Sequence, residues 1–129
     1  MTAASPPQDP RIQAATAHWA VRMIANGIDY NDFLATTGRL TRWEDWSAEW
    51  SKTAANHEAL AREAEERGSP ISAAEAYVRA SICHHFGKFV FFEDMAQYKR
   101  ADAATVANYR KARSEEHTSE LQSPCNLVC

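Results

Sequence analysis

The stretch that decides the fold is residues 43–64, WEDWSAEWSKTAANHEALAREA. Its apolar side chains recur at intervals of three and four residues, the spacing of one face of an α-helix. At about 150–250 Å² per tryptophan and about 25 cal/mol per Å², burial of the indole rings supplies on the order of 10 kcal/mol before entropy is counted. The segment therefore predicts a long amphipathic helix whose inner face carries Trp43, Trp46, Trp50, Ala54, His57, Ala61 and Ala64.

The same periodicity continues on both sides and predicts an all-α fold of about five helices, arranged as an array of helical hairpins. No convincing strand pattern interrupts it, and we expect the short apolar run 89–92 to end a helix. Short connections favour packing of successive helices as antiparallel neighbours. The expected helices cover residues 10–26, 30–37, 42–67, 71–91 and 95–112.

Polar residues and glycines mark the expected helix ends. Asp9, Asp29 and Asp94 stand where a side chain can cap a helix N-terminus, and Thr41 with Glu44 has the spacing of a capping box. The glycines at 27, 38 and 68 follow helical patterns and are expected to end them.

Two further helical faces can be assigned from spacing. Within 71–91, small residues recur as Ala76, Ala80, Cys83 and Gly87, which favours close approach of a neighbouring helix. The inner face of the last helix is expected to consist of Met95, Tyr98, Ala101, Val106 and Tyr109.

Length and composition exclude several classes of protein. A chain of 129 residues has room for one domain, and 14 basic against 17 acidic side chains give a net charge of −3. That balance argues against a nucleic-acid-binding protein, which would need a basic excess. We expect no membrane span and no signal peptide, and hence a cytoplasmic protein. Three cysteines, an odd number, do not form a disulfide framework.

The sequence divides into three parts. Residues 1–9 are expected to be a flexible leader, and residues 10–112 a single helical, cap-like domain. The remainder, 113–129, lacks apolar periodicity, and residues 113–123 (RSEEHTSELQS) resemble the translation of a common sequencing-library adapter. We therefore expect a disordered, non-native tail and a natural protein that continues beyond Ala112, and we assign no role to Cys125 or Cys129.

Residues with catalytic potential are few. There is no G-x-S-x-G elbow, glycine-rich phosphate loop or C-x-x-C pair, and we predict neither a cofactor nor a metal. The adjacent His84 and His85 point about 100° apart on a helix, so they are ill placed to share a metal. They are interpreted as packed side chains, with a role in lining a ligand pocket left open. His57 is expected to be a satisfied core histidine, and Cys83 a buried, inert thiol.

Residues 10–112 resemble the N-terminal helical segment of bacterial α/β-hydrolases of the 2,6-dihydroxypseudooxynicotine hydrolase group and related esterase-like enzymes. The resemblance implies a cap over a later catalytic domain that carries the Ser, Asp and His, so no catalytic residue is predicted here. The residues that carry it are Trp43-x-x-Trp46-x-x-x-Trp50, Glu58, Ala61, Gly68, residues 73–81 (AAEAYVRAS), residues 84–94 (HHFGKFVFFED) and Tyr109-Arg110.

The implied partners are that missing catalytic domain and a small-molecule substrate, and a homodimer with a second copy of the chain is left open. Within this chain His84, His85, Lys88 and Phe89 are the candidates for lining the substrate pocket, because they combine polar and aromatic character on one helix. The alternative is a stand-alone protein-interaction module resembling a tetratricopeptide hairpin around Gly68, although no second copy of such a hairpin is present.

Overall fold

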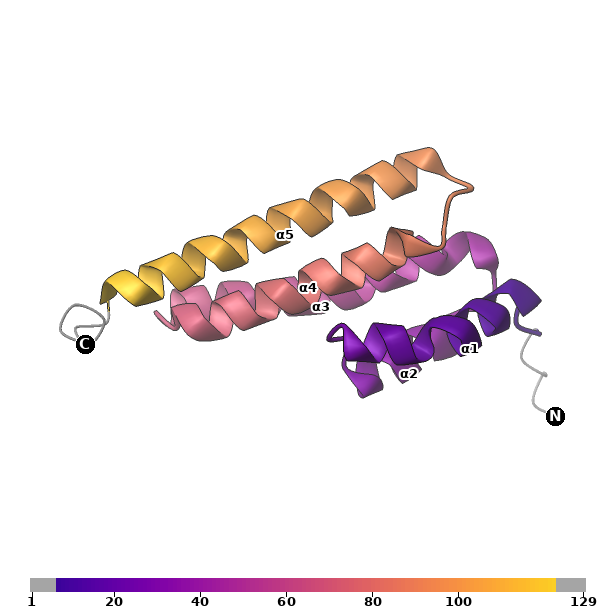
Figure 1. Ribbon diagram of the computed structural model, residues 1–129, viewed down its shortest axis with the longest axis horizontal. Coiled ribbons are helices and arrows are strands. Elements are labelled where there is room, and N and C mark those ends of the chain that lie inside the picture. Colours follow the sequence, from indigo (N-terminus) through magenta and orange to yellow (C-terminus); the bar gives the residue numbers. More distant parts are fainter. Residues whose placement is uncertain (1–6, 123–129) are drawn as a thin grey trace.

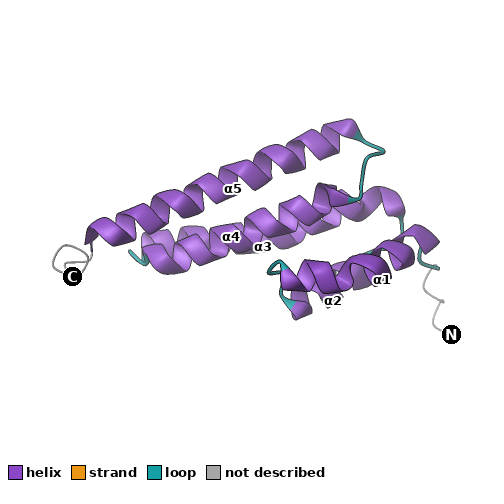
Figure 2. Cartoon of the chain, viewed as in Figure 1, coloured by secondary structure: helices purple, strands orange, loops and turns teal. Residues whose placement is uncertain are grey.

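The computed structural model describes residues 7–122, and the side chains of residues 7–119 within them. This part of the chain is helical with no strand, which confirms the all-α prediction (Figure 2). The elements are α1 (Pro10–Ala25), α2 (Tyr30–Arg39), the 3-10 turn η1 (Trp43–Asp45), α3 (Trp46–Glu66), α4 (Pro70–Phe89) and α5 (Met95–Gln122). None of these helices is long and apolar enough to cross a membrane.

The three long helices form a layered array with α4 in the middle. α4 packs against α3 on one side and α5 on the other, whereas α3 and α5 meet at only a few residues. Both α3 and α5 run antiparallel to α4 and thus parallel to each other (Figure 1). The shorter α1 and α2 lie along one end of this array, next to the first turns of α3.

Three of the predicted caps are present. The Asp9 carboxylate accepts a hydrogen bond from the Arg11 N–H, and Asp29 accepts from the N–H groups of Asn31 and Asp32. The carboxylate of Asp94 accepts from the backbone N–H of Gln97 at 3.1 Å. These side chains satisfy donors that have no partner within their own helices.

The predicted capping box is wrong. The chain enters α3 through the 3-10 turn, and no side chain caps that turn. The Glu44 carboxylate instead lies 3.6 Å from the Arg11 guanidinium and 3.8 Å from that of Arg42, so its contacts are with side chains.

The predicted stop at Gly38 is also wrong, because α2 continues to Arg39. Only Gly27 and Gly68 have positive φ among the described glycines, at 112° and 71°, and both follow a helix end. Beyond Gly38, Arg39 pairs with Glu49 at 2.9 Å, and the Leu40 side chain is buried in the core. These tertiary contacts hold the last turn of α2 in place.

The sequence predicts that the apolar run 89–92 forms the end of a helix. In the structure α4 ends at Phe89, and residues 90–92 lie outside the helix. Phe91 then turns into the core, 1% exposed, with its ring centroid 6.0 Å from that of Trp43. Phe92 points outward and stacks on Tyr98 at 5.7 Å. Leaving the helix after Phe89 allows side chains that would otherwise cover several helix faces to reach different surroundings.

α5 extends past the predicted end at residue 112. Residues 113–122 continue the helix, and the rest of the predicted tail, 123–129, lies outside the described residues. The predicted inner face of α5 is only partly correct, because Met95, Val106 and Tyr109 are exposed. The buried positions are Ala101, Asn108 and Ala112.

The predicted tryptophan face forms the centre of the core. Trp46 and Trp50 are fully buried, and the ring centroids of Trp43 and Trp46 lie 5.4 Å apart. The small-residue stripe of α4 faces α3: a Cβ added at Gly87 would lie 3.1 Å from Trp50 Cβ. A second, alanine-rich cluster fills the other end of α3 and α4, where burial and a hydrogen bond to Glu65 raise the pKa of Tyr77 to about 12.

Candidate functional site: the groove between α3 and α5

A groove of about 390 Å³, lined by both polar and apolar groups, lies between α3 and α5, with α4 as its floor. Both α3 and α5 pack on α4 but contact each other at only a few residues, which leaves this space between them. Its lining residues are Ser47, Ala48, Ser51 and Glu58 from α3, His84 from α4, and Gln97, Arg100, Ala101 and Ala104 from α5.

A histidine–carboxylate pair spans α4 and α3 at this groove. His84 Nε2 lies 3.1 Å from Glu58 Oε1, and the two side chains are 9% and 25% exposed. The buried Nδ1 of His84 has no hydrogen-bond partner among the described atoms. The imidazole is therefore held by one nitrogen, and the carboxylate of Glu58 keeps a second oxygen for another donor.

Other groove side chains have unused hydrogen-bonding capacity. Ser47 is 3% exposed, and neither its hydroxyl nor that of Ser51 has a partner within residues 7–119. Arg100 forms no ion pair in that range, and Asp94, whose pKa is lowered mainly by Gln97 and partly by Arg100, is hydrogen-bonded to Gln97. The groove thus combines one unpaired cation, two hydroxyls and a partly engaged carboxylate.

The four residues predicted to line a substrate pocket lie on two sides of α4. His84 faces the groove, and Lys88, one turn later, pairs with Asp102 of α5 at 2.5 Å. His85 and Phe89 face α1 instead: Phe89 contacts Trp19 edge-to-face at 4.8 Å, and the His85 and Phe89 rings are 5.6 Å apart. Only His84 of the four lines the groove.

His85 lies against aromatic rings and near two cations, and it is less buried than its neighbour His84. Burial is the main cause that lowers the pKa of His85, and the positive charges of Lys88 and Arg22 add to it. The ring therefore favours its neutral form and packs against Phe86 and Phe89.

A second histidine–carboxylate pair lies on the other side of α3. His57 Nε2 is 2.6 Å from Asp32 Oδ2, which joins α3 to α2 and gives the predicted core histidine a partner. Burial and the charge of Asp32 raise the pKa of the nearby Cys83 to about 12, which disfavours the reactive thiolate. Within the described residues, no three His, Cys, Asp or Glu side chains are grouped so as to hold a metal ion.

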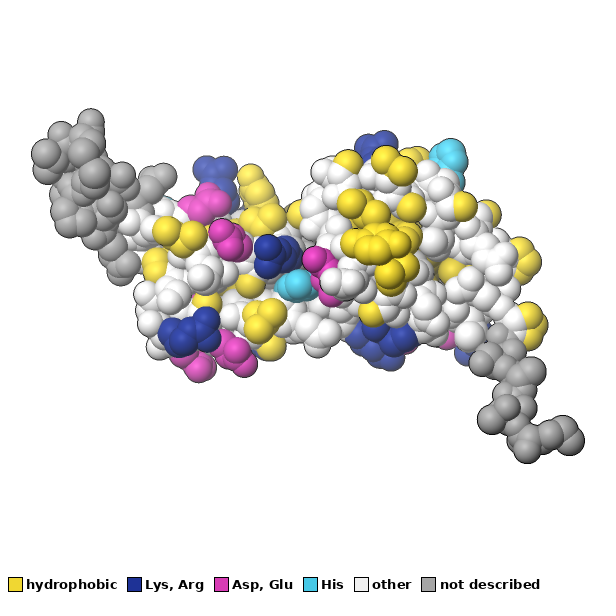
Figure 3. Space-filling view, turned by 90° about the horizontal axis from the view of Figure 1, so that it is seen from below, with side chains coloured by type: hydrophobic (Ala, Val, Ile, Leu, Met, Phe, Trp, Pro, Cys, Tyr) yellow, Lys and Arg dark blue, Asp and Glu magenta, His cyan; other side chains and the backbone are white. Residues whose placement is uncertain are grey.

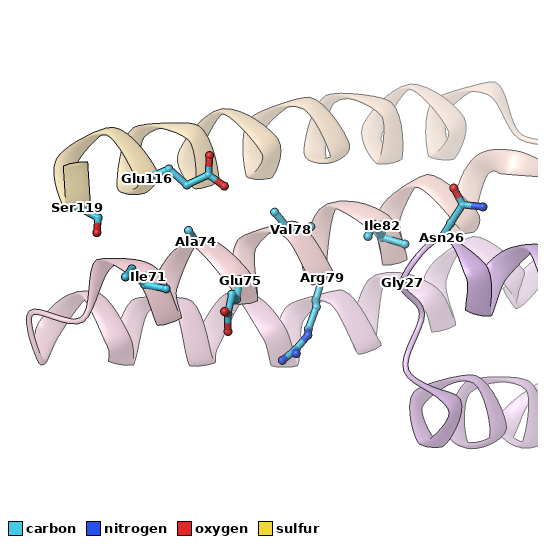
Figure 4. A pocket seen from close by; sticks show the side chains of 10 residues that line it. All are labelled: Asn26, Gly27, Ile71, Ala74, Glu75, Val78, Arg79, Ile82, Glu116 and Ser119. Atoms are coloured by element: carbon cyan, nitrogen blue, oxygen red, sulfur yellow. The ribbon is translucent and has the colours of Figure 1, made fainter. Parts of the chain in front are cut away.

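A larger groove of about 770 Å³ runs along α4, between the α1–α2 connection and the last turns of α5 (Figure 4). Ile71, Val78 and Ile82 line its floor, with Glu75 and Arg79 beside them. Figure 3 shows apolar side chains gathered on the neighbouring half of the molecule, which carries α1 and α2. The exposed apolar residues there are Val21, Ile24, Tyr30 and Leu34.

The comparisons with known proteins find a distant similarity. A curated protein, 2,6-dihydropseudooxynicotine hydrolase of Paenarthrobacter nicotinovorans, is 28% identical over 91 residues, covering 70% of this chain. The chain is distantly related to a hydrolase. It spans about a quarter (24%) of the length of that relative. No family model and no solved structure matches the sequence.

The sequence reasoning missed the groove. Glu58 belongs only to the motifs of the family resemblance, and Ser47, Ser51 and Arg100 belong to no motif. A signal was present, since residues 47, 51 and 58 are separated by four and seven positions and share one helix face. The position of α5 brings Arg100 opposite that face, and the spacing of residues within a helix does not predict how two helices lie relative to each other.

Proposed function

We propose that this chain is a helical cap segment of an α/β-hydrolase whose catalytic domain lies outside the present sequence. The observation that carries the proposal is the 28% identity to a hydrolase over 91 residues, 70% of this chain. The motif resemblance of residues 10–112 to such caps supports it. The exposed apolar side chains of α1 and α2 also suit a segment that meets another domain.

In this proposal the parent enzyme hydrolyses a carbonyl compound. A serine of the catalytic domain attacks the carbonyl carbon, and backbone N–H groups of that domain stabilise the oxyanion. The helical segment shapes the substrate pocket and limits the access of water. Its own side chains form and break no bond, so the isolated chain has no hydrolase activity.

The proposal includes a non-native origin for residues 113–129. The adapter-like string then replaces the natural continuation of the protein, and the helical form of residues 113–122 reflects local propensity, since glutamate, leucine and glutamine favour helix. The natural residues after Ala112 would be those that lead towards the catalytic domain.

The gene gives a direct test. We expect the genomic reading frame after the codon for Ala112 to continue into a sheet-forming region with a serine elbow, followed by an aspartate or glutamate and a histidine. A stop codon close to that position would overturn the proposal and favour an independent interaction module.

A biochemical test follows from the same gene. The full-length protein should hydrolyse p-nitrophenyl acetate, and replacing its elbow serine by alanine should abolish this activity. The present chain, at equal concentration, should match the buffer rate. Hydrolysis by the present chain above that rate would contradict the proposal, because it places no nucleophile here.

A further inference from the structure

The groove between α3 and α5 has features of a ligand site that the packing of the fold does not require. The α3 and α5 positions that line it are serine, alanine and the hydrogen-bonding side chains of Glu58, Gln97 and Arg100, with no large apolar residue among them. The volume of about 390 Å³ lies within the usual range of small-molecule sites, about 300–1,000 Å³. All its lining residues precede residue 113, so the groove is independent of the adapter-like segment.

One half of the groove is suited to an anion. Because α3 and α5 run in the same direction (Figure 1), their first turns lie at the same end of the array. Ser47 and Ser51 of α3 and Arg100 of α5 line the groove there. A guanidinium without an ion pair and two hydroxyls without partners are the donors that a carboxylate uses. The Ser47 side chain is 3% exposed, but its hydroxyl oxygen is not one of the fully buried polar atoms without a partner, so it stays accessible to a molecule in the groove.

The other half is suited to a hydrogen-bond donor. Glu58 lies seven residues, about 10 Å, further along α3 than Ser51. His84 occupies one of its carboxylate oxygens and orients the group, which leaves the second oxygen for a ligand hydroxyl. The methyl groups of Ala101 and Ala104 line the space between and suit an apolar body.

We propose that this groove binds a small organic acid that also carries a hydroxyl group, with the carboxylate at Arg100 and the hydroxyl at Glu58. This binding site goes beyond the proposed role as a cap segment and does not depend on it. A flat, rigid hydroxy acid fits best, because it separates the two polar groups by a fixed apolar span and loses little entropy on binding.

The test uses 4-hydroxybenzoate as the probe and the full 129-residue chain. Titration followed by ¹H–¹⁵N correlation spectra should give saturable shifts at Ser47, Ser51 and Arg100. Benzoate, which lacks the hydroxyl, and phenol, which lacks the carboxylate, should each bind more weakly to the same residues. Absence of saturable shifts in the groove at millimolar probe would overturn the proposal.

Variants separate this site from adventitious binding. Arg100→Ala should raise the Kd for 4-hydroxybenzoate at least about tenfold, since a charge-assisted pair is lost. Arg79→Ala, an exposed arginine that lines the other groove, should leave it unchanged. Equal effects of the two substitutions would sink the assignment.

Glu58→Gln should remove the preference for 4-hydroxybenzoate over benzoate while benzoate still binds. Melting curves establish whether this variant remains folded. If it does not fold, two other comparisons still test the proposal. These are the affinities of the three probes for the unmodified chain, and the effects of Arg100→Ala and Arg79→Ala on the Kd for 4-hydroxybenzoate. A preference for the hydroxyl that persists in folded Glu58→Gln would show that the hydroxyl lies elsewhere, against the proposal.

Discussion

The hydrogen bond of the Trp46 indole can be isolated by comparing two tryptophans that are equally buried. Trp46 and Trp50 are both 0% exposed and both lie on α3. Trp46 Nε1 donates to the backbone carbonyl of Phe86 at 2.9 Å, whereas Trp50 Nε1 is buried without an acceptor among the described atoms. Phe86 is one of the last four residues of α4, whose carbonyls lack the usual helical partner.

Replacing each tryptophan by phenylalanine removes a similar amount of packing, about 1–2 kcal/mol. In Trp46→Phe the Phe86 carbonyl also loses its donor while it stays buried, which costs about 1–3 kcal/mol more. In Trp50→Phe an unsatisfied donor disappears, which offsets part of the packing loss. We therefore expect Trp46→Phe to lower the free energy of unfolding by at least about 1 kcal/mol more than Trp50→Phe, out of a total of about 5–15 kcal/mol.

Urea unfolding followed by circular dichroism at 222 nm measures both variants against the parent chain. Equal m-values would show that the two substitutions act on the folded state rather than on the unfolded ensemble. If Trp50→Phe proved as destabilising as Trp46→Phe, the indole–carbonyl bond would contribute nothing measurable and the reasoning would be refuted.

Three further predictions test the packing and the titrating groups. Gly87→Ala should destabilise the fold by about 1 kcal/mol, because the new methyl meets Trp50 Cβ at 3.1 Å; Gly38→Ala, with nothing within 4 Å, should stabilise it by a few tenths of a kcal/mol. The opposite order in urea unfolding would contradict this packing. Cys83, with its pKa raised to about 12, should be alkylated by iodoacetamide only after unfolding, as read by peptide mass spectrometry; rapid labelling of the native chain would count against it. His85 has a pKa lowered from 6.5, so the unfolded chain takes up a proton that the folded chain does not, and stability falls as pH drops from 7 to 5. The difference in free energy of unfolding between the parent chain and His85→Gln should therefore be smaller at pH 5 than at pH 7. A larger difference at pH 5 would mean that the pKa of His85 is raised on folding and not lowered.

Local patterns predict the helices of this protein well where they act within one or two turns. The aspartate caps at 9, 29 and 94 were correct because capping needs only a side chain and the next few backbone N–H groups. The tryptophan face was correct because the spacing of residues on one helix fixes which of them share a side. The errors at Gly38 and at the Thr41–Glu44 capping box arose where contacts with a distant segment outweighed the local preference.

The face of α5 shows where the spacing is insufficient. Alanine occurs on several sides of this helix, so larger residues such as Val106 and Tyr109 appeared to mark the interior. They are exposed, and the small Ala101 and Ala112 are buried, because α5 packs closely on α4. Size alone does not identify the buried side of an alanine-rich helix, since close packing favours the smaller residue.

The sequence by itself determined that this chain is helical, where α1, α2, α4 and α5 begin, and which side of α3 carries the core, because backbone propensity and the helical repeat act over a few residues. The tertiary structure alone decided which side chains meet across helices. It separated His84 from His85 and Phe89, joined His84 to Glu58, and left Arg100 facing the serines of α3. These pairings depend on the relative position and direction of α3, α4 and α5, which are set by the packing of whole helices and are not encoded in the spacing within any one of them.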